Sequence, residues 1–204
     1  ALQKEMDALN LLYDLQRKQY QIALQNVQII NRKCHELNVQ IADLRRLQPD
    51  EAATQSLDEA EQAARMYDAN AATGNEVLDV VLTEKSLLCE AQRIRLNCVA
   101  DGTCLAAIEP GDLYALFSNL LDQAIDAAAQ QQNDRRMIDL LVCRRQGFAV
   151  INVIGPALSG SQSDHGRRHS YELKVARRVV QKYSGTMATE PRGELFAVKI
   201  VMPL

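Results

Sequence analysis

The residues best suited to chemistry are His35 and Glu36, which are neighbours in the sequence. A neighbouring carboxylate can orient an imidazole ring and raise the nucleophilicity of its second nitrogen, so this pair could serve as a nucleophile with its general base. The same two residues are also common on the polar surface of a helix. Without further context that plainer interpretation is favoured, so the elements that carry the pair have to be considered.

Residues 2–47 contain no Gly and no Pro, and their apolar residues recur on a seven-residue frame. One position of the frame holds Met6, Tyr13, Tyr20, Val27, Cys34 and Ile41, and the position three later holds Leu9, Ala23, Ile30, Leu37 and Leu44. Gln16 is the one polar interruption. This spacing is typical of a coiled coil, and it places His35 beside the seam on its solvent side.

The seam could pack against the chain's own domain or against a second chain. Packing on its own domain would require about 70 Å of partner surface at 1.5 Å per residue, which a domain of this size is not expected to offer. An intermolecular seam is therefore the favoured interpretation.

Pro49 ends this first helix, because proline lacks the amide donor that a helix needs. A second helix is expected over residues 51–70, and its small apolar stripe fits an antiparallel return along the first helix; the stripe consists of Leu57, Ala60, Ala64 and Tyr67. Two such hairpins would dimerise as a four-helix bundle. We therefore expect a stem over residues 1–72 and a homodimer through residues 6–67.

Residues 73–204 have the alternating helix and strand patterns of a second, globular domain. The expected helices cover residues 75–91, 112–130 and 170–183, with a loop at 155–169. The expected strands cover 94–99, 137–143, 148–154, 186–189 and 195–202, and Gln146-Gly147 marks a hairpin. Asp112 is expected to cap its helix. The fold class is α+β: a helical hairpin followed by an α/β sandwich, with a mixed sheet covered on one face by helices.

The composition narrows the functional classes. A net charge of -3 does not favour binding to nucleic acid, which is itself negatively charged. The five cysteines are scattered, without paired metal-ligand spacing, which favours reduced thiols in the cytoplasm. No apolar run is long enough to span a membrane. Because residue 1 is not Met, we expect a fragment whose membrane anchor lies in the full-length protein.

The segment around the histidine resembles a known phosphoacceptor. Residues 32–41, Arg-Lys-Cys-His-Glu-Leu-Asn-Val-Gln-Ile, are similar to the phosphoacceptor segment of one branch of bacterial sensor histidine kinases, which includes the peptide-sensing quorum kinases. The resemblance implies that His35 accepts a phosphoryl group and that Glu36 is its general base. The sequence departs from the family at Asn38 and Val39, where a basic residue and then Asn or His are usual.

Residues 119–128, Asn-Leu-Leu-Asp-Gln-Ala-Ile-Asp-Ala-Ala, resemble the N-box helix of the Bergerat-type ATP-binding (GHKL) fold that histidine kinases share with gyrase and a heat-shock chaperone. The resemblance implies that Asn119 and residue 123 face the triphosphate and its Mg²⁺, with Asp126 nearby. Gln123 stands where the family has its more critical Asn. Its extra methylene moves the carbonyl by more than about 1 Å, and Mg²⁺ is strict about geometry.

Residues 169–185 are similar to the family helix that opens with Gly-x-Gly-Leu, whose amides hold phosphates. The resemblance places Tyr171 and Leu173 at the nucleotide and makes residues 157–168 the ATP lid. Ser170 and Glu172 replace the two glycines. A carboxylate there would repel a phosphate charge by roughly 3–4 kcal/mol at 4–5 Å and an effective dielectric near 20. The adenine-side stretch, residues 151–156, also lacks the usual Asp.

Together the resemblance covers residues 27–204 and implies the core of a sensor histidine kinase. ATP and Mg²⁺ would be its cofactors, His35 would take the γ-phosphoryl group, and the receiver domain of a response regulator would be its partner. The altered nucleotide positions predict impaired ATP binding. The alternatives are a pseudokinase or dimeric scaffold that binds no nucleotide, and a plain coiled coil joined to an unrelated domain.

Overall fold

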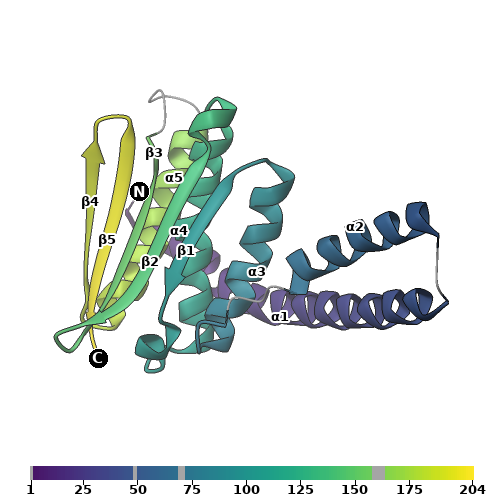
Figure 1. The fold of residues 1–204 in the computed structure, drawn as a ribbon. Coiled ribbons are helices and arrows are strands. Elements are labelled where there is room, and N and C mark those ends of the chain that lie inside the picture. The colour runs from purple at the N-terminus through teal and green to yellow at the C-terminus, as the bar shows by residue number, and fades with distance from the viewer. Residues whose placement is uncertain (1, 48–49, 69–71, 158–163) are drawn as a thin grey trace.

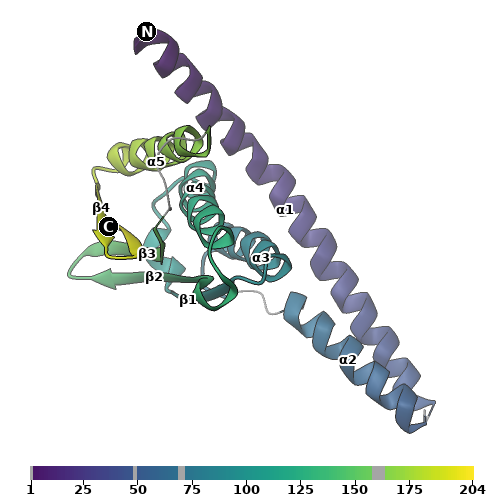
Figure 2. The same cartoon turned by 90° about the horizontal axis from the view of Figure 1, so that it is seen from above.

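The computed structural model describes residues 2–47, 50–68, 72–157 and 164–204. Its N-terminal part is a helical hairpin of α1 (Leu2–Arg46) and α2 (Glu51–Asp68), which runs back along the second half of α1 (Figures 1 and 2). Arg45 joins the two helices by ion pairs of 2.5 Å to Asp58 and 2.6 Å to Glu61. The expected hairpin is confirmed, and the expected end of its second helix at residue 70 lies outside the described residues.

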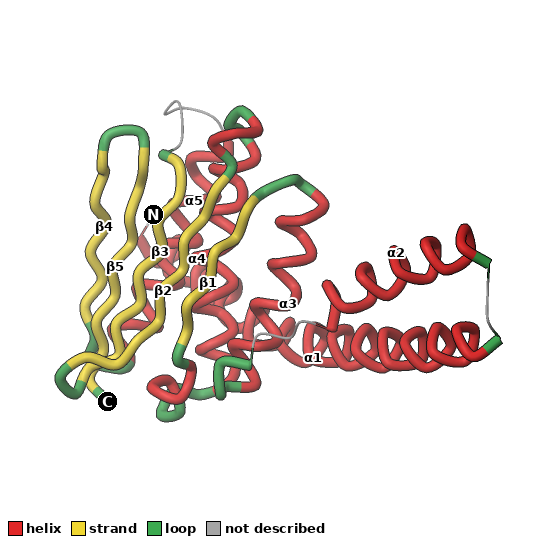
Figure 3. The backbone as a smooth tube through the Cα atoms, viewed as in Figure 1, coloured by secondary structure: helices red, strands yellow, loops and turns green. Residues whose placement is uncertain are grey.

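The C-terminal part is a five-stranded sheet with three helices over one face (Figures 2 and 3). The strand order is β1-β2-β3-β5-β4, in which β1 and β2 are parallel and the other neighbours antiparallel. The helices are α3 (Glu76–Ala91), α4 (Pro110–Ala129) and α5 (Asp164–Lys182), and the strands are β1 (Arg95–Ala100), β2 (Met137–Arg145), β3 (Phe148–Pro156), β4 (Thr186–Arg192) and β5 (Leu195–Pro203). The expected α+β class with a mixed, one-face-covered sheet is confirmed.

The hairpin between β2 and β3 forms at the expected dipeptide. Gln146 and Gly147 both adopt positive φ angles, 48° and 82°. Positive φ at both residues is typical of the two-residue hairpin turn whose twist matches that of the strands. Alternate residues of both strands are buried beneath the helices: Ile138, Leu140, Val142, Ala149, Ile151 and Val153. The two strands therefore present one face to the core, as the alternation of side chains along a strand requires.

Two expected boundaries were wrong. β3 continues to Pro156 and α5 begins at Asp164, so part of the expected 155–169 loop is regular structure. α4 begins at Pro110, because proline suits the first helical position. Asp112 therefore lies inside the first turn rather than at the cap, and its carboxylate contacts α1 and α5 instead.

Helix α1 lies across the outer side of α3, α4 and α5 (Figure 2). Tyr13, Tyr20 and Val27 of the predicted seam belong to the same hydrophobic core as those helices, while Cys34 and Ile41 are buried along the half that α2 covers. The chain therefore covers part of the predicted seam itself, whereas Met6, Leu37 and Leu44 of the seam are exposed, and the intermolecular seam stays a prediction. Among the described helices, none is both long and apolar enough to cross a bilayer.

Candidate functional site

The predicted N-box residue Asn119 is buried on α4, where its side chain faces α1 rather than an open cleft. Its amide pairs reciprocally with that of Gln16: Gln16 Nε2 donates to Asn119 Oδ1 at 2.9 Å, and Asn119 Nδ2 donates to Gln16 Oε1 at 2.6 Å. Asn119 Nδ2 also donates to the carbonyl of Ala115 at 2.5 Å. The one polar residue of the seam therefore meets the one N-box asparagine.

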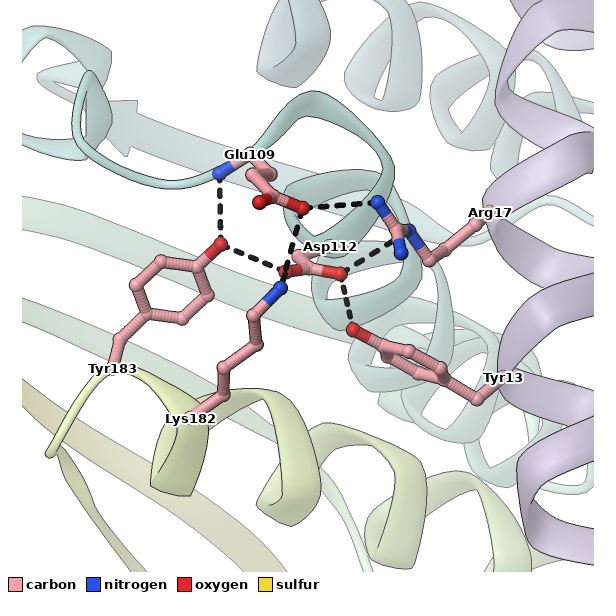
Figure 4. Close-up of polar contacts among 6 residues, drawn as sticks. All are labelled: Tyr13, Arg17, Glu109, Asp112, Lys182 and Tyr183. Atoms are coloured by element: carbon pink, nitrogen blue, oxygen red, sulfur yellow. Dashed lines mark hydrogen bonds and ion pairs between the residues drawn. The ribbon is translucent and has the colours of Figure 1, made fainter.

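Two turns before Asn119, the fully buried Asp112 holds a polar cluster together (Figure 4). Its carboxylate lies 2.5 Å from Lys182 Nζ and 3.4 Å from Arg17 Nε. The hydroxyl of Tyr183 donates to it at 2.7 Å, and the hydroxyl of Tyr13 donates to its other oxygen. Helices α1, α4 and α5, together with the residue after α5, therefore converge on one carboxylate.

Glu109, just before α4, completes the cluster at its exposed rim (Figure 4). Its carboxylate accepts from Arg17 at 2.9 Å and from Lys182 at 3.2 Å, and its backbone N–H donates to the hydroxyl of Tyr183 at 2.9 Å. The two cations therefore each bridge two carboxylates. This arrangement fixes the position of α1 at the start of α4.

The electrostatics of the cluster favour binding rather than proton transfer. Burial by itself would raise the pKa of Asp112, but hydrogen bonds from Lys182, Tyr13 and Tyr183 outweigh it and lower that pKa. Burial, followed by the hydrogen bond to Asp112, raises the pKa of Tyr13 to about 12. Both groups therefore keep one protonation state near neutrality, which does not suit a general acid or base.

Gln123 is buried one turn after Asn119, and it borders a small space between α4, β3 and β5. The space measures about 10 Å³ and is also lined by Gly155 and Pro156, the end of the predicted adenine-side stretch. This volume is on the scale of a single water molecule. Asp126, the further N-box acid, is half-exposed on the same helix.

The predicted phosphate-binding stretch lies inside α5. Because α5 starts at Asp164, the amides of residues 170–173 belong to the body of the helix and are not the free amides of a helix N-terminus. Glu172 is buried, and Leu173 packs against the core. Tyr171 is half-buried, with Lys174 Nζ 5.2 Å from its ring centre. The structure thus leaves Tyr171 and Leu173 without the glycine-opened helix start that the resemblance implied.

His35 and Glu36 are exposed on α1, and the neighbouring Cys34 is buried. The carboxylate of Glu36 lies 2.6 Å from Lys33 Nζ, and the hydrogen bond from that ammonium lowers the pKa of Glu36. His35 lies 19 residues beyond Gln16 on the same helix, which corresponds to about 28 Å along the axis. The structure therefore keeps the histidine and Asn119 well apart.

The sequence did not predict the residues with which α1 contacts the domain: Tyr13, Arg17, Lys182 and Tyr183. One signal for the contact was visible, since Gln16 interrupts an otherwise apolar seam position. A polar residue in such a position often has a specific partner. The partner itself could only be found once the helices were placed.

Residues 108–203 match the family model described as "GHKL domain". Among solved structures, the catalytic domain of histidine kinase ThkA is 15% identical with a TM-score of 0.49, covering 64% of this chain and 92% of that one. The Acinetobacter baumannii histidine kinase AdeS is 15% identical with a TM-score of 0.46, covering 83% of this chain and 97% of that one. The histidine kinase domain of the blue-light activated kinase from Erythrobacter litoralis is 15% identical with a TM-score of 0.42, covering 88% of this chain and 94% of that one. No curated protein gave a match.

Proposed function

We propose that this chain, whose residues 108–203 match the GHKL domain model, is the core of a two-component sensor histidine kinase with impaired nucleotide binding. The observation that carries the proposal is the exposed His35-Glu36 pair on a long helix joined to that domain. In this proposal residues 1–72 form the stem and residues 73–204 the GHKL-type domain. The module would be the cytoplasmic portion of a membrane-anchored sensor.

His35 is the proposed phosphoacceptor, and Glu36 its general base. Both side chains are exposed, so the receiver domain of a response regulator could reach the histidine. Phosphoryl transfer needs reacting atoms about 3–3.5 Å apart. Because about 28 Å of helix separates His35 from the residue that contacts Asn119, transfer from the chain's own GHKL domain would require a large rearrangement or a second chain.

Three observations support impaired binding of Mg-ATP. The carbonyl oxygen of Asn119 accepts a hydrogen bond from Gln16, and Gln123 borders a space of only about 10 Å³. The stretch around Glu172 is helical, so it lacks the free amides that cradle phosphates. The side chains that the structure describes therefore do not fit Mg²⁺ and a triphosphate, and no catalytic step is derived through them.

A homodimer through the stem is part of the proposal, along apolar residues of α1 that the chain itself leaves exposed. Most of the large apolar residues left exposed on α1 recur at spacings of 4, 7 or 8 residues, which keeps them on one side of the helix, and two of them belong to the predicted seam: Leu11, Leu15, Ile22, Ile29, Leu37 and Leu44. An apolar stripe of this length is a natural partner for its own copy. A monomer by light scattering at about 50 µM, well above the Kd of an obligate dimer, would contradict the dimer.

Labelling with γ-labelled Mg-ATP tests the acceptor. The full chain is incubated alone and with an ATP-competent histidine kinase, beside the variant His35→Gln and the matched control His165→Gln. We expect little label on the chain alone, and label in the mixture that His35→Gln loses and the control keeps. Label that survives in His35→Gln would refute the acceptor assignment.

The second candidate is a scaffold that neither binds nucleotide nor carries phosphate. The small volume beside Gln123 and the continuous α5 favour it equally. Labelling in the mixture separates the two functions, because a scaffold gains no label on His35 from any kinase.

A further inference from the structure

The face of α4 that carries the N-box is covered by the chain's own helix α1. The contacts fall within residues 112–119 of α4: Tyr13 and Arg17 contact Asp112, Gln16 contacts Asn119, and the ring centre of Tyr20 lies 5.8 Å from that of Tyr114. The same segment of α1 also reaches α5, where Arg178 donates to Asn10 and its guanidinium lies 5.1 Å from the ring centre of Tyr13.

The Gln16–Asn119 pair gives the contact its specificity. Buried amides are costly unless each donor and acceptor finds a partner, and these two side chains satisfy each other. An apolar residue at position 16 would continue the seam, yet it would leave the amide of Asn119 without that partner. The polar interruption in α1 and the asparagine in α4 are therefore complementary.

The side chain of Arg17 also lies close to the backbone of α4 at its start. A Cβ added to Gly111 would lie 3.0 Å from Arg17 Nε and 3.2 Å from Arg17 Cβ and Cγ. Glycine at this position lets the side chain of Arg17 lie against the helix backbone and reach both Glu109 and Asp112. The fit of α1 on α4 thus depends on shape as well as on hydrogen bonds.

We propose that the N-box face of α4 is a helix-docking site whose ligand is residues 10–27 of α1, with Asn119 and Asp112 as docking residues. This inference rests on the proposed impairment of nucleotide binding, because the docked helix occupies the carbonyl oxygen of Asn119. Docking makes the GHKL domain move with α1. A rotation or shift of the stem helix would thus change the position of the domain without any nucleotide.

A double-mutant cycle on the full chain tests the docking, with hydrogen exchange of residues 10–27 as the readout. Gln16→Leu leaves the buried Oδ1 of Asn119 without its donor, and Asn119→Leu leaves the half-buried amide of Gln16 without its partner, so each should raise exchange there by about tenfold or more. The double variant removes both amides and should return to within about threefold of the wild type. Gln21→Leu, at an exposed position of α1, is the matched control and should change nothing. Exchange of β2 and β3 reports whether the domain stays folded.

Gly111→Val provides a second route that removes no polar group. It should raise exchange in residues 10–27 by crowding Arg17, and it replaces the leucine variants if those unfold the sheet. Docking is overturned if the singles behave like the control, if the double variant is no closer to the wild type than the singles, or if saturating Mg-ATP raises exchange of residues 10–27 in the wild type. Tight Mg-ATP binding with unchanged exchange would refute the impairment of nucleotide binding and leave the docking site standing, so the two failures are distinguishable.

Discussion

Replacing Asp112 by alanine should destabilise the protein more than any change at an exposed acid, because this carboxylate is fully buried and has four partners. Two partners are the hydroxyls of Tyr13 and Tyr183, and two are the cations Lys182 and Arg17. Removing the carboxylate leaves the phenols without their acceptor. It also loosens the attachment of α1 to α4 and α5.

The magnitude follows from the exposure of the partners. The side chains of Lys182 and Arg17 are 43% and 40% exposed, so water compensates them, and each ion pair contributes only about 0.5 kcal/mol. Each phenolic hydrogen bond to the buried charge contributes about 1 kcal/mol. Asp112→Ala should therefore lower the free energy of unfolding by about 3 kcal/mol, or the Tm by about 6–12 °C for a chain of this size.

Urea denaturation followed by circular dichroism measures this loss, with thermal denaturation as a second observable. The matched control is Asp43→Ala, because Asp43 is exposed and pairs with the likewise exposed Arg46 on its own helix. We expect the control to change stability by less than about 0.5 kcal/mol. A loss below about 1 kcal/mol for Asp112→Ala would show that the cluster does not hold α1 in place, and the reasoning would be refuted.

Three further predictions follow from individual sites. Because the pKa of Asp112 is lowered, its carboxylate contributes fully to the free energy of unfolding above the ordinary pKa near 4, and this contribution is lost as pH falls through the lowered value. In acid denaturation between about pH 4 and 2, the stability of the wild type should therefore fall more steeply than that of Asp112→Asn. Gly185→Ala places a Cβ 2.5 Å from a β5 side chain and should cost about 2 kcal/mol in urea denaturation, whereas Gly155→Ala, whose nearest neighbour is 3.6 Å away, should cost less than about 1 kcal/mol. Asp122→Ala leaves the buried ammonium of Lys85 without its 2.8 Å partner and should lower the free energy of unfolding by about 2 kcal/mol. Lys85→Met removes the buried charge itself and should lower it by only about 1 kcal/mol, so equal losses would contradict the cost assigned to an unpaired buried charge.

The sequence predicted the elements where the local pattern is strong. The heptad pattern and the absence of Gly and Pro predicted α1, and the dipeptide Gln146-Gly147 predicted the hairpin of β2 and β3. Local patterns are less informative about ends, which is why the start of α5 was placed six residues late and Asp112 was assigned to a cap. Proline at position 110 was the missed signal.

The packing of α1 could not be read from periodicity. A heptad pattern shows that one face is apolar, but it does not say which surface covers that face. Tyr13, Tyr20 and Val27 of the seam pack on the same chain, whereas Leu37 and Leu44 of the same seam are exposed. In the same way, the sequence located Asn119 on an N-box-like helix but could not show that Gln16 occupies its amide, because that contact joins residues 103 positions apart.

Calorimetric titration of Mg-ATP into the purified full chain tests the central claim most directly, with Asn119→Ala as the companion variant. The nucleotide positions are altered, the space beside Gln123 is about 10 Å³, and Gln16 occupies Asn119. The account therefore predicts no saturable binding tighter than about 1 mM, and no difference between the wild type and the variant. Saturable binding with a Kd below about 100 µM that Asn119→Ala weakens would contradict it.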